Sequence, residues 1–316
     1  MDPTPTPVVL LSGHALGAFE KRLHEEGWRT VGPGEVAMAD LAQVRALAHA
    51  SILPLRQADL EAMPNLGLIH CMGAGYETVD VPWCRARGIE VTNAGDANAE
   101  LVADYALGML ISAWRNIVVG DRMVREGRWT QVAPREARGP GLKGRRLGIV
   151  GFGHIGVACA KRAEPFGLEI CWWGPRPKPE ARWPRTESLL ELATWSDILL
   201  VACRANAENR GLISREIIEA VGPEGMILNI ARGSVVDEDA LILALKDGRL
   251  GRAALDVFWE EPSPAARWAD VPNTLLTPHA AGLASDASTM IYDRAVENLR
   301  LFFAGRAVAT PVPSGA

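Results

Sequence analysis

The chain has 316 residues, of which 48% are apolar and 22% are charged, a balance that excludes a disordered, collagenous or small disulfide-stapled protein. Its length exceeds what one hydrophobic core usually organises, so about two domains with a cleft between them are predicted. The net charge of −5 argues against nucleic acid or an anionic membrane as a partner.

The cysteines and the first residues favour a cytoplasmic protein. The five cysteines are scattered and form no Cys-x-x-Cys pair, which predicts neither a disulfide framework nor a zinc site but buried thiols in a reducing compartment. The first residues lack the basic region of a signal peptide, and Asp104 interrupts the most apolar helical stretch, residues 101–114. The sequence therefore predicts a soluble cytoplasmic protein with no metal site and no membrane span.

Short apolar runs alternate with segments of helical periodicity, a pattern typical of an α/β fold with mainly parallel sheets. In the first part of the chain, strands are predicted at 8–11, 51–54, 67–71 and 89–91, with helices at 17–26, 41–48 and 81–87. A long helix over 98–116 separates this series from a second one.

The second series has the pattern of a dinucleotide-binding sheet. Strands are predicted at 146–150, 168–173, 197–202, 226–230, 252–257 and 274–277, with helices at 187–193, 215–221 and 238–246. Six strands with right-handed helical crossovers make such a sheet. A last helix over 285–304 is predicted to return the chain to the first lobe.

Two Rossmann-like or flavodoxin-like domains with doubly wound parallel sheets follow from these elements. Residues 1–97 and 284–316 are predicted to form a discontinuous substrate-binding domain. Residues 98–283 are predicted to form the dinucleotide-binding domain.

A glycine motif opens the second series. Its residues are Gly151, Phe152, Gly153, His154, Ile155 and Gly156, which directly follow a predicted strand and precede a helical segment. The first glycine permits a tight turn, the second lets backbone N–H groups approach a pyrophosphate, and the third lets helix and strand pack closely. This context predicts that the motif binds a dinucleotide.

The end of the next strand indicates which dinucleotide. An NAD site usually places Asp or Glu there to hold the ribose 2′-hydroxyl, but the chain reads Trp172-Trp173-Gly174-Pro175-Arg176-Pro177-Lys178. Gly174 leaves room for a 2′-phosphate, and Arg176 and Lys178 are placed to pair with it. NADP(H) is therefore the preferred cofactor, with NAD(H) as the alternative and a solvated basic loop as the other interpretation.

Three polar residues follow the ends of later strands, where ligands of doubly wound sheets bind. His279 is placed to act as a general acid or base, and a carboxylate such as Glu261 on its other ring nitrogen would fix the tautomer and keep a proton available near neutral pH. Arg232 is placed to hold a substrate carboxylate and polarise a neighbouring carbonyl. Each residue alone is more often a surface ion pair or a helix cap, so the prediction depends on the set.

With these residues assembled, the chain resembles the D-isomer-specific 2-hydroxyacid dehydrogenase family over nearly its whole length. The matching segments are residues 71–80, 142–156, 229–238, 255–262 and 277–279. The resemblance implies that the catalytic set is Arg232, Glu261 and His279, and that the substrate carboxylate binds the backbone N–H groups of Met72, Gly73, Ala74 and Gly75. It also implies cofactor contacts from Cys203, Arg204, Ile230, Ala231, Asp256, His279 and Ala281, with Asp256 on the nicotinamide amide.

Within this family the chain is most similar to NADP-using glyoxylate and hydroxypyruvate reductases. Formate dehydrogenases carry an amide where Glu261 stands, and phosphite-oxidising relatives carry a lysine where Ala74 stands, so both chemistries are disfavoured. Two departures from the family pattern are Asp104, where a glutamate is usual, and Arg204-Ala205-Asn206, where Pro-Leu-Thr is common. Arg204 could bind a phosphate or shape the substrate site.

The sequence thus predicts an oxidoreductase that reduces a small 2-keto acid, such as glyoxylate or hydroxypyruvate, to the D-2-hydroxy acid with NADPH. The family resemblance also implies a homodimer built on the dinucleotide-binding domain. One alternative is an NAD-dependent 2-hydroxyacid dehydrogenase with another substrate range. Another is an NAD(P)-sensing, corepressor-like binding protein, since the fold alone does not exclude it. The physiological substrate stays open, because the pocket depends on side chains from both lobes.

Overall fold

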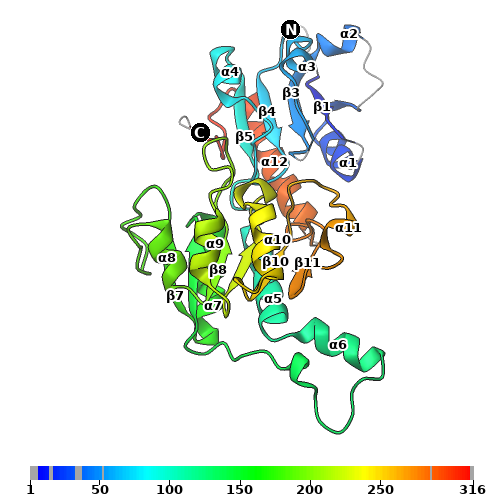
Figure 1. Cartoon of the computed structure of the whole chain (residues 1–316). Helices are drawn as coiled ribbons and strands as arrows, with labels where there is room; N and C mark the ends of the chain where they lie inside the picture. Colours follow the sequence, from blue (N-terminus) through cyan, green and yellow to red (C-terminus); the bar gives the residue numbers. More distant parts are fainter. Residues whose placement is uncertain (1–5, 14–16, 33–37, 52, 285–286, 314–316) are drawn as a thin grey trace. The chain divides into compact units, whose positions relative to one another are not determined.

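The chain divides into two compact units, which the computed structural model describes over residues 6–13, 17–32, 38–51, 53–284 and 287–313 (Figure 1). The first unit comprises Met1–Asn98 and Ser285–Ala316, and the second comprises Ala99–Ala284. Each unit contains one parallel sheet with helices, which confirms the predicted α/β class with two parallel sheets.

The sheet of the first unit has five strands in the order β2-β1-β3-β4-β5, and its neighbouring strands pair in parallel. This is the flavodoxin-like order. The strands are β1 (Val8–Leu11), β2 (Arg29–Val31), β3 (Val44–His49), β4 (Leu68–Cys71) and β5 (Glu90–Asn93). The helices are α1 (Gly17–Glu25), α2 (Met38–Leu41), α3 (Gln57–Glu61), α4 (Val81–Ala86) and α12 (Ala287–Phe303).

Two predicted elements of this unit are wrong. The helix expected over 41–48 is largely the strand β3, and the strand expected over 51–54 is a turn at Ser51, with Ile52 outside the described residues. The alanine-rich sequence of β3 suits a helix, but five of its six residues are buried between β1 and β4. Packing in the sheet therefore outweighs local propensity.

The sheet of the second unit has six parallel strands in the order β11-β10-β9-β8-β6-β7. They are β6 (Arg146–Val150), β7 (Glu169–Trp173), β8 (Ile198–Val201), β9 (Met226–Asn229), β10 (Arg252–Leu255) and β11 (Thr274–Leu276). The α-helices are α5 (Ala99–Trp114), α6 (Ile117–Arg125), α7 (His154–Ala163), α8 (Leu189–Trp195), α9 (Arg215–Val221), α10 (Glu238–Lys246) and α11 (Ala265–Trp268). The strand order reverses at β6 and β8, so the ligand-binding edge is expected at their carboxyl ends.

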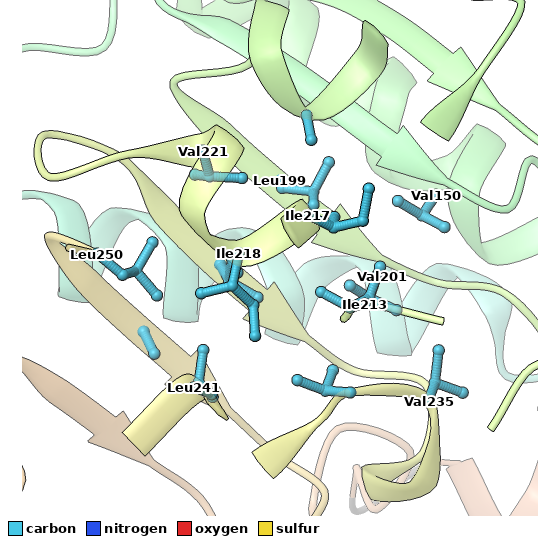
Figure 2. Packing of buried hydrophobic residues seen from close by; sticks show 14 of the residues in the cluster. Val150, Leu199, Val201, Ile213, Ile217, Ile218, Val221, Val235, Leu241 and Leu250 are labelled. Atoms are coloured by element: carbon cyan, nitrogen blue, oxygen red, sulfur yellow. The ribbon is translucent and has the colours of Figure 1, made fainter. Parts of the chain in front are cut away.

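Apolar side chains cover both faces of this second sheet. On one face, Leu199 of β8 belongs to the same buried cluster as Ile217 and Ile218 of α9, and Figure 2 shows these residues close together. On the other face, the buried side of α5, which ends at the fully buried Trp114, belongs to the same cluster as the fully buried Trp172 of β7. Each large apolar side chain buried in this way contributes about 1.5–3 kcal/mol, which makes the sheet a rigid support for the loops at its edge.

None of the helices in the described ranges is by itself long and apolar enough to cross a bilayer. The pair α5 and α6 passes the test of length and composition only when both helices are taken together across a bend of 64°.

Candidate active site

The glycine motif forms a tight turn between β6 and α7. Gly151 has a φ of +88°, and a Cβ on it would lie 2.4 Å from the Cα of Cys203. A Cβ on Gly156 would lie 2.3 Å from the carbonyl oxygen of Gly151, whereas a Cβ on Gly153 would meet nothing within 4 Å. The first and third glycines are therefore needed for the turn itself, and the second leaves open space beside the amino terminus of α7. Such a cradle fits a pyrophosphate group.

Between these glycines the side chains differ in exposure. Phe152 is buried and stacks on Trp172 of β7, with ring centroids 4.8 Å apart and an interplanar angle of 14°. Only its backbone is therefore available to a ligand. His154 is exposed and Ile155 half-buried at the start of α7.

The first residues after β7, 174–178, form a loop that carries positive charge and no acidic residue. Gly174 is buried and its carbonyl oxygen accepts hydrogen bonds from the Arg185 side chain, at 2.9 and 3.3 Å. Arg176 is exposed, Lys178 is half-buried, and neither has a carboxylate partner within the described part of the chain. These residues fit an anionic group on the ribose rather than a free 2′-hydroxyl.

The loop after β8 is locked by its own amides. The backbone N–H of Asn206 and that of Asn209 each donate to the other residue's side-chain oxygen, and the Asn209 amide donates to the carbonyl of Arg204 at 2.6 Å. Burial raises the pKa of the Cys203 thiol to about 11, so this thiol stays protonated near neutral pH. The unusual Arg204-Ala205-Asn206 segment is thus well defined and adjoins the glycine turn through Cys203.

The loop after β9 presents Arg232. The Asn229 side chain accepts from the Ala231 N–H and donates to the Arg232 carbonyl, each at 3.0 Å, which fixes the loop backbone through buried Ile230 and Ala231. A Cβ on Gly233 would lie 1.9 Å from the Phe258 carbonyl carbon. Only glycine at this position therefore lets the loop contact the segment after β10, which leads to Glu261.

A carboxylate and an imidazole meet beyond β10 and β11. His279 Nδ1 lies 2.6 Å from Glu261 Oε2, and Glu261 Oε1 accepts from the Phe258 N–H at 2.9 Å. Burial alone would raise the pKa of Glu261, but the hydrogen bond from His279, the Phe258 amide and the charge of Arg232 together hold that pKa below its usual value. Glu261 is therefore a charged partner for one nitrogen of the ring.

His279 lies on a turn that Asp256 organises. His279 has a φ of +51°, and its N–H donates to the Asp256 carbonyl at 2.8 Å. The buried Asp256 carboxylate accepts from the Thr277 hydroxyl at 2.6 Å and from the N–H groups of Ala280 and Ala281 at 2.8 and 2.9 Å. The family resemblance implies a contact of Asp256 with the nicotinamide amide but does not indicate this internal role, because two of its three donors are backbone groups.

In the first unit, the loop after β4 offers backbone donors. Met72 N–H donates to the His49 carbonyl, while the carbonyls of Gly73 and Ala74 accept from Ala94 N–H and the Asn93 amide. Within the residues that the structure describes, the N–H groups of Gly73, Ala74 and Gly75 have no acceptor in the chain. Three neighbouring free N–H groups suit an anion such as a carboxylate.

The buried His49 holds this loop in place through hydrogen bonds. His49 contacts the hydroxyl of Ser12 through Nδ1 at 3.1 Å and that of Thr78 through Nε2 at 3.0 Å. Burial lowers the pKa of His49 to about 4, so the ring is neutral near pH 7. Its carbonyl holds the start of the loop and its ring holds the far end, a role that no sequence pattern indicated.

Asp104, which stands where the family usually has a glutamate, still contacts a positively charged side chain. Arg162 of α7 pairs with Asp104 and with Glu100 of α5, each at 2.6 Å. The shorter side chain therefore still ties α5 to α7. Over the described ranges, no group of three or more His, Cys, Asp or Glu side chains is arranged to hold a metal ion.

Comparisons with known proteins agree on one family. A family model described as the NAD binding domain of D-isomer specific 2-hydroxyacid dehydrogenases matches residues 107–281. A hydroxyphenylpyruvate reductase from Plectranthus scutellarioides is 38% identical over 80% of this chain and 80% of its own length.

Solved structures are similar over nearly the whole chain. A 2-hydroxyacid dehydrogenase from Ketogulonicigenium vulgare Y25 has a TM-score of 0.88 and 36% identity, covering 98% of this chain and 99% of that one. An NADPH-dependent glyoxylate/hydroxypyruvate reductase from Sinorhizobium meliloti, in complex with NADP and malonate, has a TM-score of 0.87 and 32% identity, covering 97% and 96%.

Proposed function

The chain belongs to the D-isomer specific 2-hydroxyacid dehydrogenase family, and we propose that it reduces a small 2-keto acid such as glyoxylate or hydroxypyruvate to the D-2-hydroxy acid, with NADPH as the preferred cofactor. It is an oxidoreductase that uses a nicotinamide cofactor. The observation that carries the proposal is the 2.6 Å contact between Glu261 and His279 at the edge of a dinucleotide-binding sheet.

When bound, the cofactor supplies a hydride to the carbonyl carbon of the substrate. Because Glu261 occupies Nδ1 of His279, Nε2 is the ring nitrogen left to give its proton to the developing alkoxide. The contact with the Glu261 carboxylate fixes the orientation of the ring. Arg232 holds the substrate carboxylate and polarises the keto oxygen, and the free N–H groups of Gly73 to Gly75 are further proposed ligands of the carboxylate.

The cofactor contacts are proposed to follow the strand ends of the second unit. The N–H groups of the glycine motif face the pyrophosphate, and Arg176 and Lys178 pair with the 2′-phosphate. The nicotinamide end is proposed to lie along Cys203, Arg204, Ile230, Ala231, Asp256 and Ala281. Since both Asp256 oxygens already accept hydrogen bonds from the chain, its contact with the nicotinamide amide uses a remaining lone pair.

The first experiment measures oxidation of NADPH and of NADH with glyoxylate, hydroxypyruvate, pyruvate and phenylpyruvate. We expect turnover with at least one acid and a higher kcat/KM for NADPH. His279→Gln should abolish turnover, because the new side chain has no proton to give to the alkoxide, while the variant should still bind the cofactor. Cofactor binding without turnover of any acid would favour a sensing protein instead.

A homodimer is proposed on the exposed apolar residues of α6 and the loop after it, which project from the sheet of the second unit in Figure 1. Ile117, Val124, Trp129 and Val132 are 51%, 57%, 60% and 66% exposed. Soluble monomers rarely expose so many neighbouring apolar residues, and a second copy of the same chain would cover them. Light scattering should give a dimer mass for the wild type and a monomer mass for Ile117→Glu with Val124→Glu. A monomeric wild type would refute the proposal.

A further inference from the structure

A short segment, residues 184–186, pairs with β7 at the edge of the sheet of the second unit. Trp172 N–H donates to the Pro184 carbonyl at 3.0 Å, and Thr186 N–H donates to the Trp172 carbonyl at 2.9 Å. Trp172 and Arg185 form a parallel bridge at this register. The backbone of Arg185 is therefore fixed beside the end of β7, although the two residues lie in different segments.

From this position Arg185 reaches the loop after β7. Its Nη2 and Nε both donate to the carbonyl of Gly174, at 2.9 and 3.3 Å, and its guanidinium carbon lies 5.9 Å from the centre of the Trp172 ring. Within the described ranges, no carboxylate lies in ion-pair distance of Arg185. An arginine is charged at any physiological pH, so this one adds an uncompensated positive charge at the first residue of the loop.

Arg182 provides the contrast within the same segment. It pairs with Glu164 at 2.5 Å and lies over the ring of Trp183 at 4.3 Å, and it has no bond to the loop after β7 among the described residues. The two arginines are three positions apart and carry the same charge, but only Arg185 contacts Gly174.

An aromatic stack joins Arg185 to the glycine motif. Trp172 Nε1 donates to the Trp183 carbonyl at 3.0 Å, and the other side of the stack is Phe152 of the glycine motif, which also meets Trp183 edge-on at 5.7 Å. The segment that carries Arg185 is thus braced against the turn proposed to hold the pyrophosphate. The Gly174 carbonyl is consequently held at a fixed position relative to that turn.

We propose that Arg185 is a positioning and specificity-determining residue for the ribose 2′-phosphate, acting by holding the Gly174 carbonyl so that Arg176 and Lys178 face this phosphate, and by adding a third positive charge. This inference rests on the proposed NADPH preference. Without the two hydrogen bonds from Arg185 to the Gly174 carbonyl, the loop must lose conformational freedom each time it binds a phosphate, so affinity for NADPH falls. NADH lacks the phosphate, so its binding depends little on these hydrogen bonds.

The test measures dissociation constants of NADPH and NADH from the whole protein by nicotinamide fluorescence, without substrate. For Arg185→Ala we expect about ten-fold weaker NADPH binding, the effect of losing one hydrogen bond to a charged group. NADH binding should change by less than about two-fold, a difference too small to reflect loss of such a bond. Arg185→Lys keeps the charge but not the planar pair of donors, so it should restore part of the NADPH affinity. Arg182→Ala is the matched control, and both of its dissociation constants should equal those of the wild type.

Each other outcome has a distinct meaning. If the wild type binds NADPH no more tightly than NADH, the proposed cofactor preference fails and takes this inference with it. If the wild type discriminates and Arg185→Ala discriminates equally well, only the inference about Arg185 is overturned. Equal weakening of both cofactors would make Arg185 a general support of the fold, and an equal effect of Arg182→Ala would reduce it to surface charge. Arg185→Lys keeps the test valid if the alanine variant does not fold.

Discussion

Asp256→Asn tests whether a buried carboxylate fixes the turn that carries His279. Asp256 is 1% exposed, and its Oδ1 accepts two hydrogen bonds while its Oδ2 accepts the N–H of Ala281. Asparagine has the same shape but one of its terminal atoms is an NH2 group, which cannot accept. Whichever way the amide is oriented, at least one buried donor of the turn loses its acceptor.

The cost follows from these contacts. Removing a hydrogen bond to a charged group and leaving a buried N–H without an acceptor costs about 3 kcal/mol in total. In a unit of this size each kcal/mol lowers the melting temperature by about 2–4 °C, so a decrease of roughly 6–12 °C is expected. The turn also loses its definition around His279, so kcat with saturating cofactor and 2-keto acid should fall as well.

The assay combines differential scanning calorimetry with steady-state kinetics. Thr277→Val is the control, because it removes one of the three donors to Asp256 and leaves the carboxylate charged. It should lower the melting temperature by about 2–4 °C, the effect of one hydrogen bond. An Asp256→Asn protein that melts within about 2 °C of the wild type, a shift of less than 1 kcal/mol, with unchanged kcat, would refute the reasoning.

Three further predictions follow from the same geometry. Glu261→Gln keeps one oxygen as an acceptor for His279 but loses the charge and turns its NH2 group toward the Phe258 N–H, so kcat should fall by about ten-fold or more, the kinetic equivalent of a charge-assisted bond. Because the pKa of Glu261 is lowered in the folded protein, its ionised carboxylate stabilises the fold at pH values above the ordinary carboxyl pKa, and this stabilisation is lost as the pH falls. The melting temperature of the variant should therefore lack this part of its dependence on pH. Because burial lowers the pKa of His49 to about 4, the unfolded chain takes up a proton that the folded chain does not, so melting temperature should fall as pH drops below about 6.5, and less in His49→Gln. Gly156→Ala places a Cβ 2.3 Å from the carbonyl oxygen of Gly151, so titration with NADPH should show binding weakened by more than about ten-fold while wild-type-like binding would contradict the proposed cradle.

The second sheet was predictable because its strands are short apolar runs that no helix pattern fits. Residues 146–150 and 226–229 are buried on both faces, as expected for a parallel sheet with helices on each side. The carboxyl ends of such strands meet at one edge, so polar residues placed just after them converge in space. Glu261 and His279 could be brought together on this argument alone, although they belong to different strand ends.

The first sheet was less accessible to the same reasoning. The sequence of β3 has the alanine content of a helix, and its burial between β1 and β4 is a property of the sheet rather than of the segment. A helix predicted over 41–48 leaves 51–54 as the next apolar run to which a strand can be assigned. The error therefore propagated because strand assignments in alternating folds depend on one another.

The positioning residues were beyond any motif for a different reason. Asn229, Asp256 and Arg185 act on backbone N–H or carbonyl groups, Asn229 within its own loop and the other two at more distant positions of the chain. Nearly every residue type offers the same backbone N–H and carbonyl groups, so the identity of the residue that accepts or donates such a bond does not reveal that it does so. Relatives can therefore carry identical glycine and catalytic motifs and still differ at such a residue, and the loop that it holds will differ with it. On the proposal made for Arg185, a change at such a residue would alter the cofactor preference without any change in the residues that touch the cofactor.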